Sequence, residues 1–248
     1  MGLRIVFFDC DGTLTTVKSS WQYLHERLDL WDRKADEFQR LFQAGQIGYA
    51  EFCRRDAALW KGLSLERVLR IMGDIPLHEG VRETMEALRA QGILTVLLST
   101  GLSFLVDKVR RELDMTLAVA NDLIVREGVL TGEVMIQVDH DQGHPSGPAL
   151  RQGPEERGSS GPIPAGEHSS GAGGLHTKGY WVKKLLGEWG IGKEEAAAVG
   201  DGEGDRGMFE EVGLAIGYQP SAGILPLLDH ACRNGSFREV HHVLGAHR

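Results

Sequence analysis

Short apolar runs recur along the chain, and each of them ends in a polar or glycine-containing loop. The pattern predicts five buried strands, at residues 5–8, 93–98, 117–120, 196–199 and 214–217. Continuous apolar runs of this kind are typical of parallel sheets, whose strands are covered on both faces. We therefore expect a sheet with helices packed against both of its faces.

Apolar residues at helical spacing lie between these runs. They predict helices at residues 81–88, 105–113, 180–189 and 205–212. A β-hairpin is predicted where residues 123–125 and 129–138 flank the turn dipeptide Glu127-Gly128. Strands that alternate with helices, with polar loops at the carboxyl ends of the strands, indicate an α/β fold with a doubly wound parallel sheet.

The stretch that follows the first strand breaks this alternation. Ser19 and Gln22 have the spacing of a capping box, and Trp21, Leu24 and Leu28 follow at helical spacing. From there to about residue 73 the chain reads as helices only. We therefore predict a small α-helical cap at 15–76, inserted after the first strand of a catalytic core formed by 1–14 and 77–248.

Residues 139–177 differ in composition from the rest of the core. They hold five of the eight prolines and nine glycines, and they include no aromatic residue. Such a stretch cannot bury enough apolar surface to offset its chain entropy, so it is predicted to be a flexible insert. Its histidines, among them His140 and His176, are interpreted as exposed loop residues rather than as metal ligands.

Overall composition narrows the class of protein. Of the 248 residues, 42% are hydrophobic and 25% charged, and the formal net charge is −8. No basic stripe is present, which argues against a nucleic-acid partner. The apolar run near the start is too short for a signal peptide or a membrane span. Three widely spaced cysteines suit a reducing compartment, so a cytoplasmic protein is expected, as a monomer or a homodimer.

The first loop carries two carboxylates. Asp9 and Asp11 follow the first strand in the run Asp-Cys-Asp-Gly-Thr, and both can face the crevice above the sheet. Their proximity is repulsive unless a cation lies between them. Mg²⁺ prefers such oxygen ligands, and a carboxylate at the metal can also act as a nucleophile. Taken alone, however, an Asp-x-Asp pair is a weak signal.

Two further loops offer groups for an anion. Ser99, Thr100 and Gly101 end the second predicted strand, where a hydroxyl and backbone N–H groups can hold phosphate oxygens. Lys178 opens a helix, where its charge adds to the helix dipole. Each signal alone is also explained by an ordinary turn or by a surface lysine.

The fourth loop is Gly-Asp-Gly-Glu-Gly-Asp at residues 200–205, between a strand and a helix. Asp201 and Asp205 suggest a second wall of a metal site. The loop does not fit a nucleotide-binding glycine motif, because its acidic residues would repel a pyrophosphate. All four loops lie at the end of a strand or the start of the next helix, and in a doubly wound sheet such positions converge on one crevice.

With these motifs in this order, the chain resembles the haloacid dehalogenase (HAD) superfamily, and within it the phosphoserine-phosphatase-like branch. The helical cap between the first two motifs and Thr131-Gly132 after the hairpin also fit that branch. The motifs that carry the resemblance are residues 9–15, Ser99-Thr100-Gly101, Lys178 and residues 200–205. It covers nearly the whole chain except 139–177, and it implies the HAD-type, Rossmann-like sheet.

The resemblance implies roles for the acidic residues. Asp9 is expected to attack phosphorus and become phosphorylated, and Asp11 to protonate the leaving oxygen and then activate water. Asp9, the backbone carbonyl of Asp11 and Asp201 are expected to hold Mg²⁺. Asp205 is expected to hold a metal-bound water or to support the site.

Phosphate and substrate contacts are implied as well. Ser99, with Thr100 and Gly101, and Lys178 are expected to bind the transferred phosphoryl group. In the cap, Lys18 stands where phosphoserine-specific enzymes have an acidic residue, and the position of their substrate-binding arginine falls on Asp56 beside Arg54 and Arg55.

Lys18, Arg54 and Arg55 are therefore candidate substrate contacts, but these departures count against phosphoserine as the physiological substrate. Gly204 also stands where the family more often has asparagine.

The function predicted is that of a Mg²⁺-dependent phosphomonoesterase acting on a small phosphorylated metabolite through an aspartyl-phosphate intermediate. Phosphoserine phosphatase proper and a phosphotransferase with the same intermediate stay open. A dehalogenase-type hydrolase fits less well, because that chemistry needs neither Asp11 nor the acidic last motif. A non-catalytic binding protein of the same fold would be expected to have lost Asp9, Asp11 or Lys178, and all three are present.

Overall fold

The computed structural model describes residues 2–140 and 176–247 of the chain. In this part, seven strands form one sheet in the order β4-β3-β2-β1-β5-β6-β7, parallel except for β4. The prediction of a doubly wound parallel sheet is confirmed. The strands are β1 (Ile5–Phe8), β2 (Leu94–Leu102), β3 (Leu117–Arg126), β4 (Val129–Met135), β5 (Ala196–Gly200), β6 (Leu214–Tyr218) and β7 (His230–Cys232).

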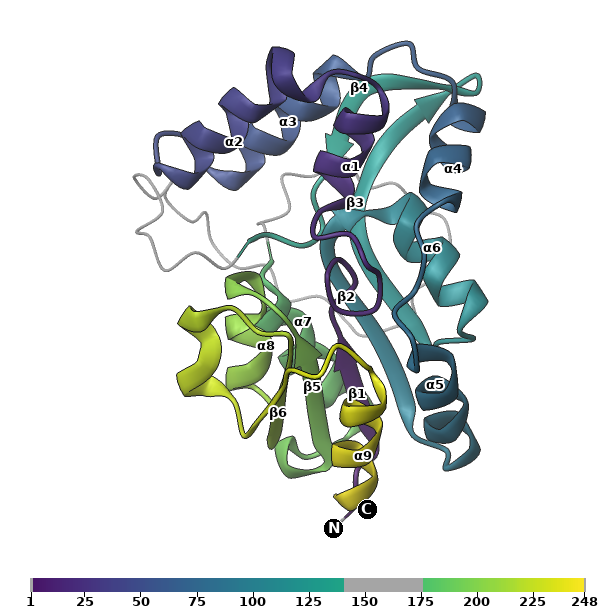
Figure 1. Ribbon diagram of the computed structural model, residues 1–248, viewed down its shortest axis with the longest axis vertical. Coiled ribbons are helices and arrows are strands. Elements are labelled where there is room, and N and C mark those ends of the chain that lie inside the picture. The colour runs from purple at the N-terminus through teal and green to yellow at the C-terminus, as the bar shows by residue number, and fades with distance from the viewer. Residues whose placement is uncertain (1, 141–175, 248) are drawn as a thin grey trace, which may run out of the picture.

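Helices cover both faces of this sheet (Figure 1). One face packs against α5, α6 and α9, and the other against α7 and α8. The helices are α1 (Ser20–Arg27), α2 (Ala35–Gln43), α3 (Tyr49–Leu59), α4 (Leu65–Gly73), α5 (Val81–Ala90), α6 (Ser103–Glu112), α7 (Lys178–Trp189), α8 (Arg206–Glu210) and α9 (Arg238–Ala246), with short 3₁₀ turns at Trp31–Arg33, Lys193–Glu195, Glu203–Asp205 and Ala222–Leu227.

The central strand β1 shows how the sequence builds two cores. All four of its residues are fully buried, and they alternate between the two faces. Val6 and Phe8 join the cluster beneath α5 and α9, whereas Ile5 and Phe7 join the cluster beneath α7. Burial on both faces fixes the register of β1, since a shift by one residue would exchange the two sets.

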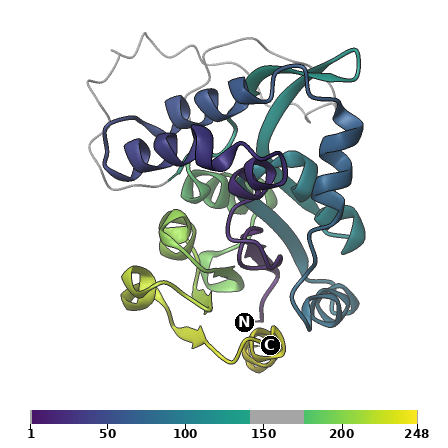
Figure 2. The same ribbon diagram turned by 45° about the horizontal axis from the view of Figure 1, so that its top comes forward.

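The segment after β1 is helical, as predicted. Ser19 caps α1, and its side chain accepts a hydrogen bond from the Gln22 backbone N–H. Both views place α1, α2 and α3 beyond the carboxyl end of β1 (Figure 1, Figure 2). The backbone N–H of Gly62 donates to Leu130, and that of Leu65 donates to Gly128, so the cap segment is joined to the β3–β4 hairpin.

Strand β3 is longer than the sequence pattern indicated. The predicted strand at 117–120 and the first arm of the hairpin are one continuous strand, because the polar residue between them is satisfied. Asn121 is fully buried; its amide donates to the Thr100 and Val138 carbonyls and accepts from the backbone N–H groups of Gln137 and Val138. The second arm stops at Met135, short of the predicted end at 138.

Other boundaries also moved. Ser99, Thr100 and Gly101 lie within β2 rather than beyond it, at a point where the pairing with β3 shifts register between Leu98 and Leu102. The helix predicted at 205–212 is a 3₁₀ turn followed by the short α8. The final strand β7 and helix α9 were not predicted at all.

Most of the predicted insert, residues 141–175, lies outside the described residues. Its two flanks meet, since the Asp139 backbone N–H donates to the His176 carbonyl at 2.8 Å. Within residues 2–140 and 176–247, no helix combines the length and apolar character needed to cross a membrane. The fold thus brings the loops after β1 and β5 and the start of α7 to one end of the sheet.

Candidate active site

Asp9 lies at the carboxyl end of β1 and faces a buried lysine. Lys178 Nζ is 2.5 Å from Asp9 Oδ1 and 2.6 Å from Asp205 Oδ1, and the lysine is only 2% exposed. Thr177 caps α7 and makes Lys178 its first residue, which directs the ammonium group toward the end of the sheet. The lysine is therefore held by two charge-assisted hydrogen bonds in a dry setting.

The charges around Lys178 do not balance. Burial would lower the pKa of Lys178, but Asp205 and Asp9 outweigh it and raise that pKa. Burial raises the pKa of Asp9; Lys178 opposes this, and the carboxylates of Asp205 and Asp201 add to it. One ammonium group thus faces three carboxylates, an arrangement that a divalent cation would neutralise.

The loop at 200–205 folds back on itself through Asp205. Asp205 Oδ2 accepts hydrogen bonds from the backbone N–H groups of Asp201, at 2.9 Å, and Gly202, at 3.1 Å. Asp201 Oδ1 accepts from the Thr13 hydroxyl at 3.3 Å, and Asp201 Oδ2 from Lys18 Nζ at 2.7 Å. Asp205 is consequently occupied by Lys178 and the backbone, in line with a supporting role, while Asp201 borders the cavity.

A metal ion fits this donor set. Ligand atoms of Asp9, Asp201 and Asp205 lie within 4.8 Å of one another. Carboxylate oxygens are the donors that Mg²⁺ prefers. The carboxylate of Asp11 does not belong to this cluster, which leaves only its backbone carbonyl, as expected from the family resemblance, for a metal.

Asp11 is oriented by the start of α1. Its Oδ2 accepts hydrogen bonds of 2.7 Å from both the backbone N–H and the hydroxyl of Ser20. Among the described residues, the buried Oδ1 atom has no hydrogen-bond partner. Burial raises the pKa of Asp11, and the two bonds from Ser20 oppose that shift. A carboxyl group whose protonated form is favoured, with one oxygen unused, suits a general acid.

The Ser99-Thr100-Gly101 segment lies against Asp11. Ser99 is buried, and its hydroxyl accepts from the Gly101 backbone N–H at 2.9 Å. A Cβ atom at Gly101 would lie 2.7 Å from Asp11 Oδ2 and 2.6 Å from Ser20 Oγ, so only glycine fits. Thr100 and Gly101 line the cavity, whereas Ser99 is not among the residues that border it.

The three predicted cap contacts separate. Lys18 borders the cavity through its ion pair with Asp201. Arg54 and Arg55 lie outside it; both pair with Glu51, at 2.7 and 2.9 Å. Asp56 is buried inside the cap, with Oδ1 at 3.2 Å from His25 Nε2. The structure thus brings only Lys18 of the three to the reacting groups.

Several cavity residues were missed by sequence reasoning. Ser20, which holds Asp11, could have been found from its place directly after the capping residue Ser19. His140 was interpreted as an exposed loop residue, but it is half-buried and lines the cavity. Trp21, Phe42, Tyr49 and Phe52 line it from the cap. These four have no common spacing in the sequence that would mark them as one wall.

The comparisons with known proteins agree with this geometry. The model of the haloacid dehalogenase-like hydrolase family matches residues 6–210. A phosphoserine phosphatase of Methanocaldococcus jannaschii is 27% identical over 243 residues, covering 96% of this chain and 95% of that protein. A phosphoserine phosphatase of Idiomarina loihiensis is 23% identical over 236 residues, covering 95% and 91%.

Solved structures show the same fold. A phospho-aspartyl intermediate analogue of phosphoserine phosphatase matches with a TM-score of 0.72 at 23% identity, and a substrate-bound phosphoserine phosphatase complex with a TM-score of 0.73 at 22% identity. Each comparison covers 98% of this chain and 99% of the other. With the family model spanning most of its length and the four motifs gathered at one end of the sheet, the chain belongs to the haloacid dehalogenase-like hydrolase family, in its phosphoserine-phosphatase-like branch.

Proposed function

We propose that this enzyme uses Asp9 as nucleophile and Asp11 as acid and base to hydrolyse the phosphate monoester of a small metabolite with Mg²⁺. The chain is a HAD-type phosphatase, a phosphoric monoester hydrolase that works through an aspartyl-phosphate intermediate. The observation that carries the residue assignment is the buried contact of Lys178 with Asp9 and Asp205, with Asp11 two residues away.

The steps follow from the groups in place. A carboxylate oxygen of Asp9 attacks phosphorus, and the bond from phosphorus to the ester oxygen breaks. Asp11 gives its proton to the departing alcohol, then takes a proton from water, whose oxygen attacks the phosphorus of phospho-Asp9 and releases phosphate. Lys178 balances charge on the transferred group throughout.

A bound Mg²⁺ ion would be held by Asp9, the backbone carbonyl of Asp11 and Asp201, and would neutralise negative charge on the phosphoryl oxygens. Asp205 would keep Lys178 and the loop at 200–205 in position. The Gly101 backbone N–H is already bonded to Ser99, so we assign Ser99 to shaping this segment as well as to phosphate binding. The three cysteines are free and buried, which is consistent with work in the cytoplasm.

The test is phosphate release from 4-nitrophenyl phosphate and a panel of alkyl esters, with Mg²⁺ and with a chelator. Asp9→Asn should reduce release at least about 10³-fold for every ester, because the nucleophile is lost. Asp107→Asn, on the exposed face of α6, is the matched control and should behave like the wild type.

After an acid quench, label from a radioactive phosphate ester should stay on the wild-type protein and be absent from Asp9→Asn. Phosphate release that survives Asp9→Asn in a folded protein would overturn the assignment of the nucleophile.

A further inference from the structure

The cavity above Asp9 has two unlike walls. It encloses about 400 Å³, a volume suited to a small organic ligand. The wall on the sheet side carries the carboxylates and lysines described above. The wall on the cap side is built from rings that come from α1, α2, α3 and the residue before the undescribed segment: Trp21, Phe42, Tyr49, Phe52 and His140.

Two of these rings have their polar ends turned away from the cavity. Trp21 Nε1 donates to the Thr100 carbonyl at 3.1 Å, and the Tyr49 hydroxyl donates to the same oxygen at 2.6 Å. The Tyr49 oxygen in turn accepts from Asn121 at 3.0 Å. Because these groups are satisfied by the protein, what Trp21 and Tyr49 offer to a ligand is ring surface.

Phe42 makes the wall continuous. Its ring centroid is 5.2 Å from that of Phe52 in a stacked pair and 5.8 Å from that of Tyr49. The His140 ring stands edge-on to Phe42 at 5.6 Å and lies 5.9 Å from Tyr49. These separations are those of aromatic packing, so the rings form one surface rather than scattered contacts.

His140 also reaches the motif loop. A Cβ atom placed on Gly204 would come within 3.3 Å of His140 Nε2, tighter than an ordinary contact. Gly204 stands where the family more often has asparagine, so the smaller residue makes room for the imidazole. The ring wall therefore continues from the cap down to the loop that carries Asp201.

The cap side supplies no full charge to this wall within the described residues. Gln39 and Gln43 are its polar members. Lys18 is engaged with Asp201, and the ion pairs of Arg54 and Arg55 hold them outside the cavity.

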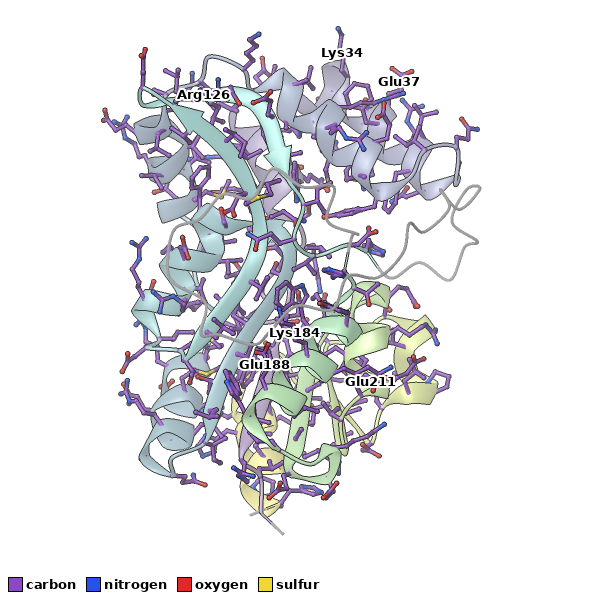
Figure 3. All side chains as sticks on the ribbon, turned by 180° about the vertical axis from the view of Figure 1, so that it is seen from behind. Lys34, Glu37, Arg126, Lys184, Glu188 and Glu211 are labelled. Carbon is purple, nitrogen blue, oxygen red and sulfur yellow. The ribbon has the colours of Figure 1, made fainter. Side chains whose placement is uncertain are left out.

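The charged residues of α2 face away from the rings. Lys34, just before α2, and Glu37 project outward at the far end of the cap (Figure 3), and Asp36 pairs with Arg40 on the surface. A substrate that carries an ammonium and a carboxylate group would lose their hydration here without gaining a partner from the cap.

We propose that the leaving group of the substrate is uncharged and presents an aromatic ring, or a flat apolar face of similar size, to this wall. The inference rests on the proposed function, since it names the class of ester that the same site hydrolyses. Ring stacking and the removal of apolar surface from water would hold such a group while its phosphate lies at Asp9.

Three esters of primary alcohols test this with the wild type: ethyl phosphate, 2-phenylethyl phosphate and O-phosphoserine. All three release an alcohol, so differences report the remainder of the leaving group. We expect kcat/KM for 2-phenylethyl phosphate to exceed the other two values at least about tenfold, the scale of one ring buried in a fitted pocket.

A matched pair of variants locates the effect. Phe42→Ala should remove most of the advantage of 2-phenylethyl phosphate over ethyl phosphate, chiefly through KM, and leave ethyl phosphate within about twofold. Phe38→Ala is the control: Phe38 lies on the same helix but packs under the Arg55 guanidinium, outside the cavity. It should preserve the ratio.

The outcomes separate the two proposals. Equal rates for ethyl and 2-phenylethyl phosphate, or a preference for O-phosphoserine, would overturn the inference while hydrolysis itself upheld the proposed function. An advantage that survives Phe42→Ala would also overturn it, since the rings named here would not be the ones in contact. If no ester were hydrolysed, 4-nitrophenyl phosphate included, the proposed function would fail and this inference with it.

Discussion

The two walls of the cavity differ in how they are held. On the sheet side, Lys178 and Asp205 are each 2% exposed, and hydrogen bonds of 3.1 Å or less fix both. On the cap side, Phe42 is half-buried and contacts its neighbours through ring packing alone. A site built this way separates chemistry, which needs preorganised charge, from selection of the leaving group, which needs a shaped apolar surface.

Only a few contacts join the two walls. Ser20 at the start of α1 bonds to Asp11, while Trp21 and Tyr49 meet on the Thr100 carbonyl. Cap movement would therefore be felt at the general acid and at one carbonyl group. The comparison predicts that substitutions on the sheet side lower the rates for all esters by one factor, and that substitutions on the cap side change their order.

The largest effect is expected for Lys178→Met. Removing the ammonium group leaves the carboxylates of Asp9 and Asp205 buried without a countercharge, which should cost about 3–5 kcal/mol of unfolding free energy. The loss of charge stabilisation in the transition state should lower kcat at least about 100-fold. Urea unfolding with a chelator present and kcat for the three esters would measure both.

Lys183→Met is the control on the same helix. Its side chain is 68% exposed and pairs with Glu211 at 3.0 Å, so neither stability nor rate should change appreciably. If Lys178→Met altered the order of the esters rather than lowering all rates alike, the division between the two walls would be wrong.

Ser20→Ala should have the next largest effect. Asp11 Oδ2 would lose its bond from the hydroxyl and keep the one from the backbone N–H. A hydrogen bond to a charged group contributes about 1.5–3 kcal/mol, which corresponds to a roughly 10–100-fold fall in kcat. The fall should be equal for all three esters.

Ser64→Ala provides the comparison for Ser20→Ala. Ser64 caps α4 by accepting from the Arg67 backbone N–H, far from the reacting groups, so its loss should reduce stability by about 1 kcal/mol and leave kcat unchanged. A change of ester preference in Ser20→Ala, without a fall in kcat, would place Ser20 with the selective wall instead.

The same division explains what could be predicted from the sequence. Asp9, Asp11, Lys178 and Asp201 follow strands or open a helix, and the rule that strand ends converge in a doubly wound sheet brings them together. The ring wall follows no such rule. Trp21, Phe42 and Tyr49 belong to three helices, and only the angles between those helices make them neighbours.

Local signals misled where a tertiary contact outweighed them. Asn121 breaks an apolar run, which reads as the end of a strand, yet its amide is fully bonded and β3 continues through it. His140 adjoins a stretch of loop composition, but aromatic packing draws it into the cavity. In both cases the deciding partner lies on another element, such as Thr100 or Phe42, and spacing along the chain cannot indicate it.

A smaller effect is expected for Lys18→Met. The Lys18 ammonium occupies Asp201 Oδ2, but its side chain is 64% exposed, so the pair should contribute no more than about 1 kcal/mol. Without this competitor, Asp201 should bind Mg²⁺ up to about fivefold more tightly, as measured by calorimetric titration.

Arg206→Met serves as the control for Lys18→Met, because Arg206 pairs with Glu203 on the same loop and Glu203 is outside the carboxylate cluster. Weaker Mg²⁺ binding by Lys18→Met would show that Lys18 supports the metal site rather than competing for it.

The smallest effect is expected from deletion of residues 143–174. The flanks already meet, through the Asp139 N–H bond to His176 and the bridge between Asp139 and Thr177, so a short connection closes the gap. Loop-closure entropy changes slowly with length, and both walls are built from residues outside the deletion. Melting temperature and kcat/KM for all three esters should therefore stay close to the wild-type values.

The deletion also tests whether the cap-side wall is complete. An unfolded product would mean that the deleted residues are part of the packed structure and that the composition of 139–177 was misinterpreted. A folded enzyme that hydrolyses ethyl phosphate normally, but has lost its preference for 2-phenylethyl phosphate, would assign part of the selective wall to residues 143–174. Retained preference would mean that the five rings, with His140 held between Phe42 and Gly204, are sufficient to select the leaving group.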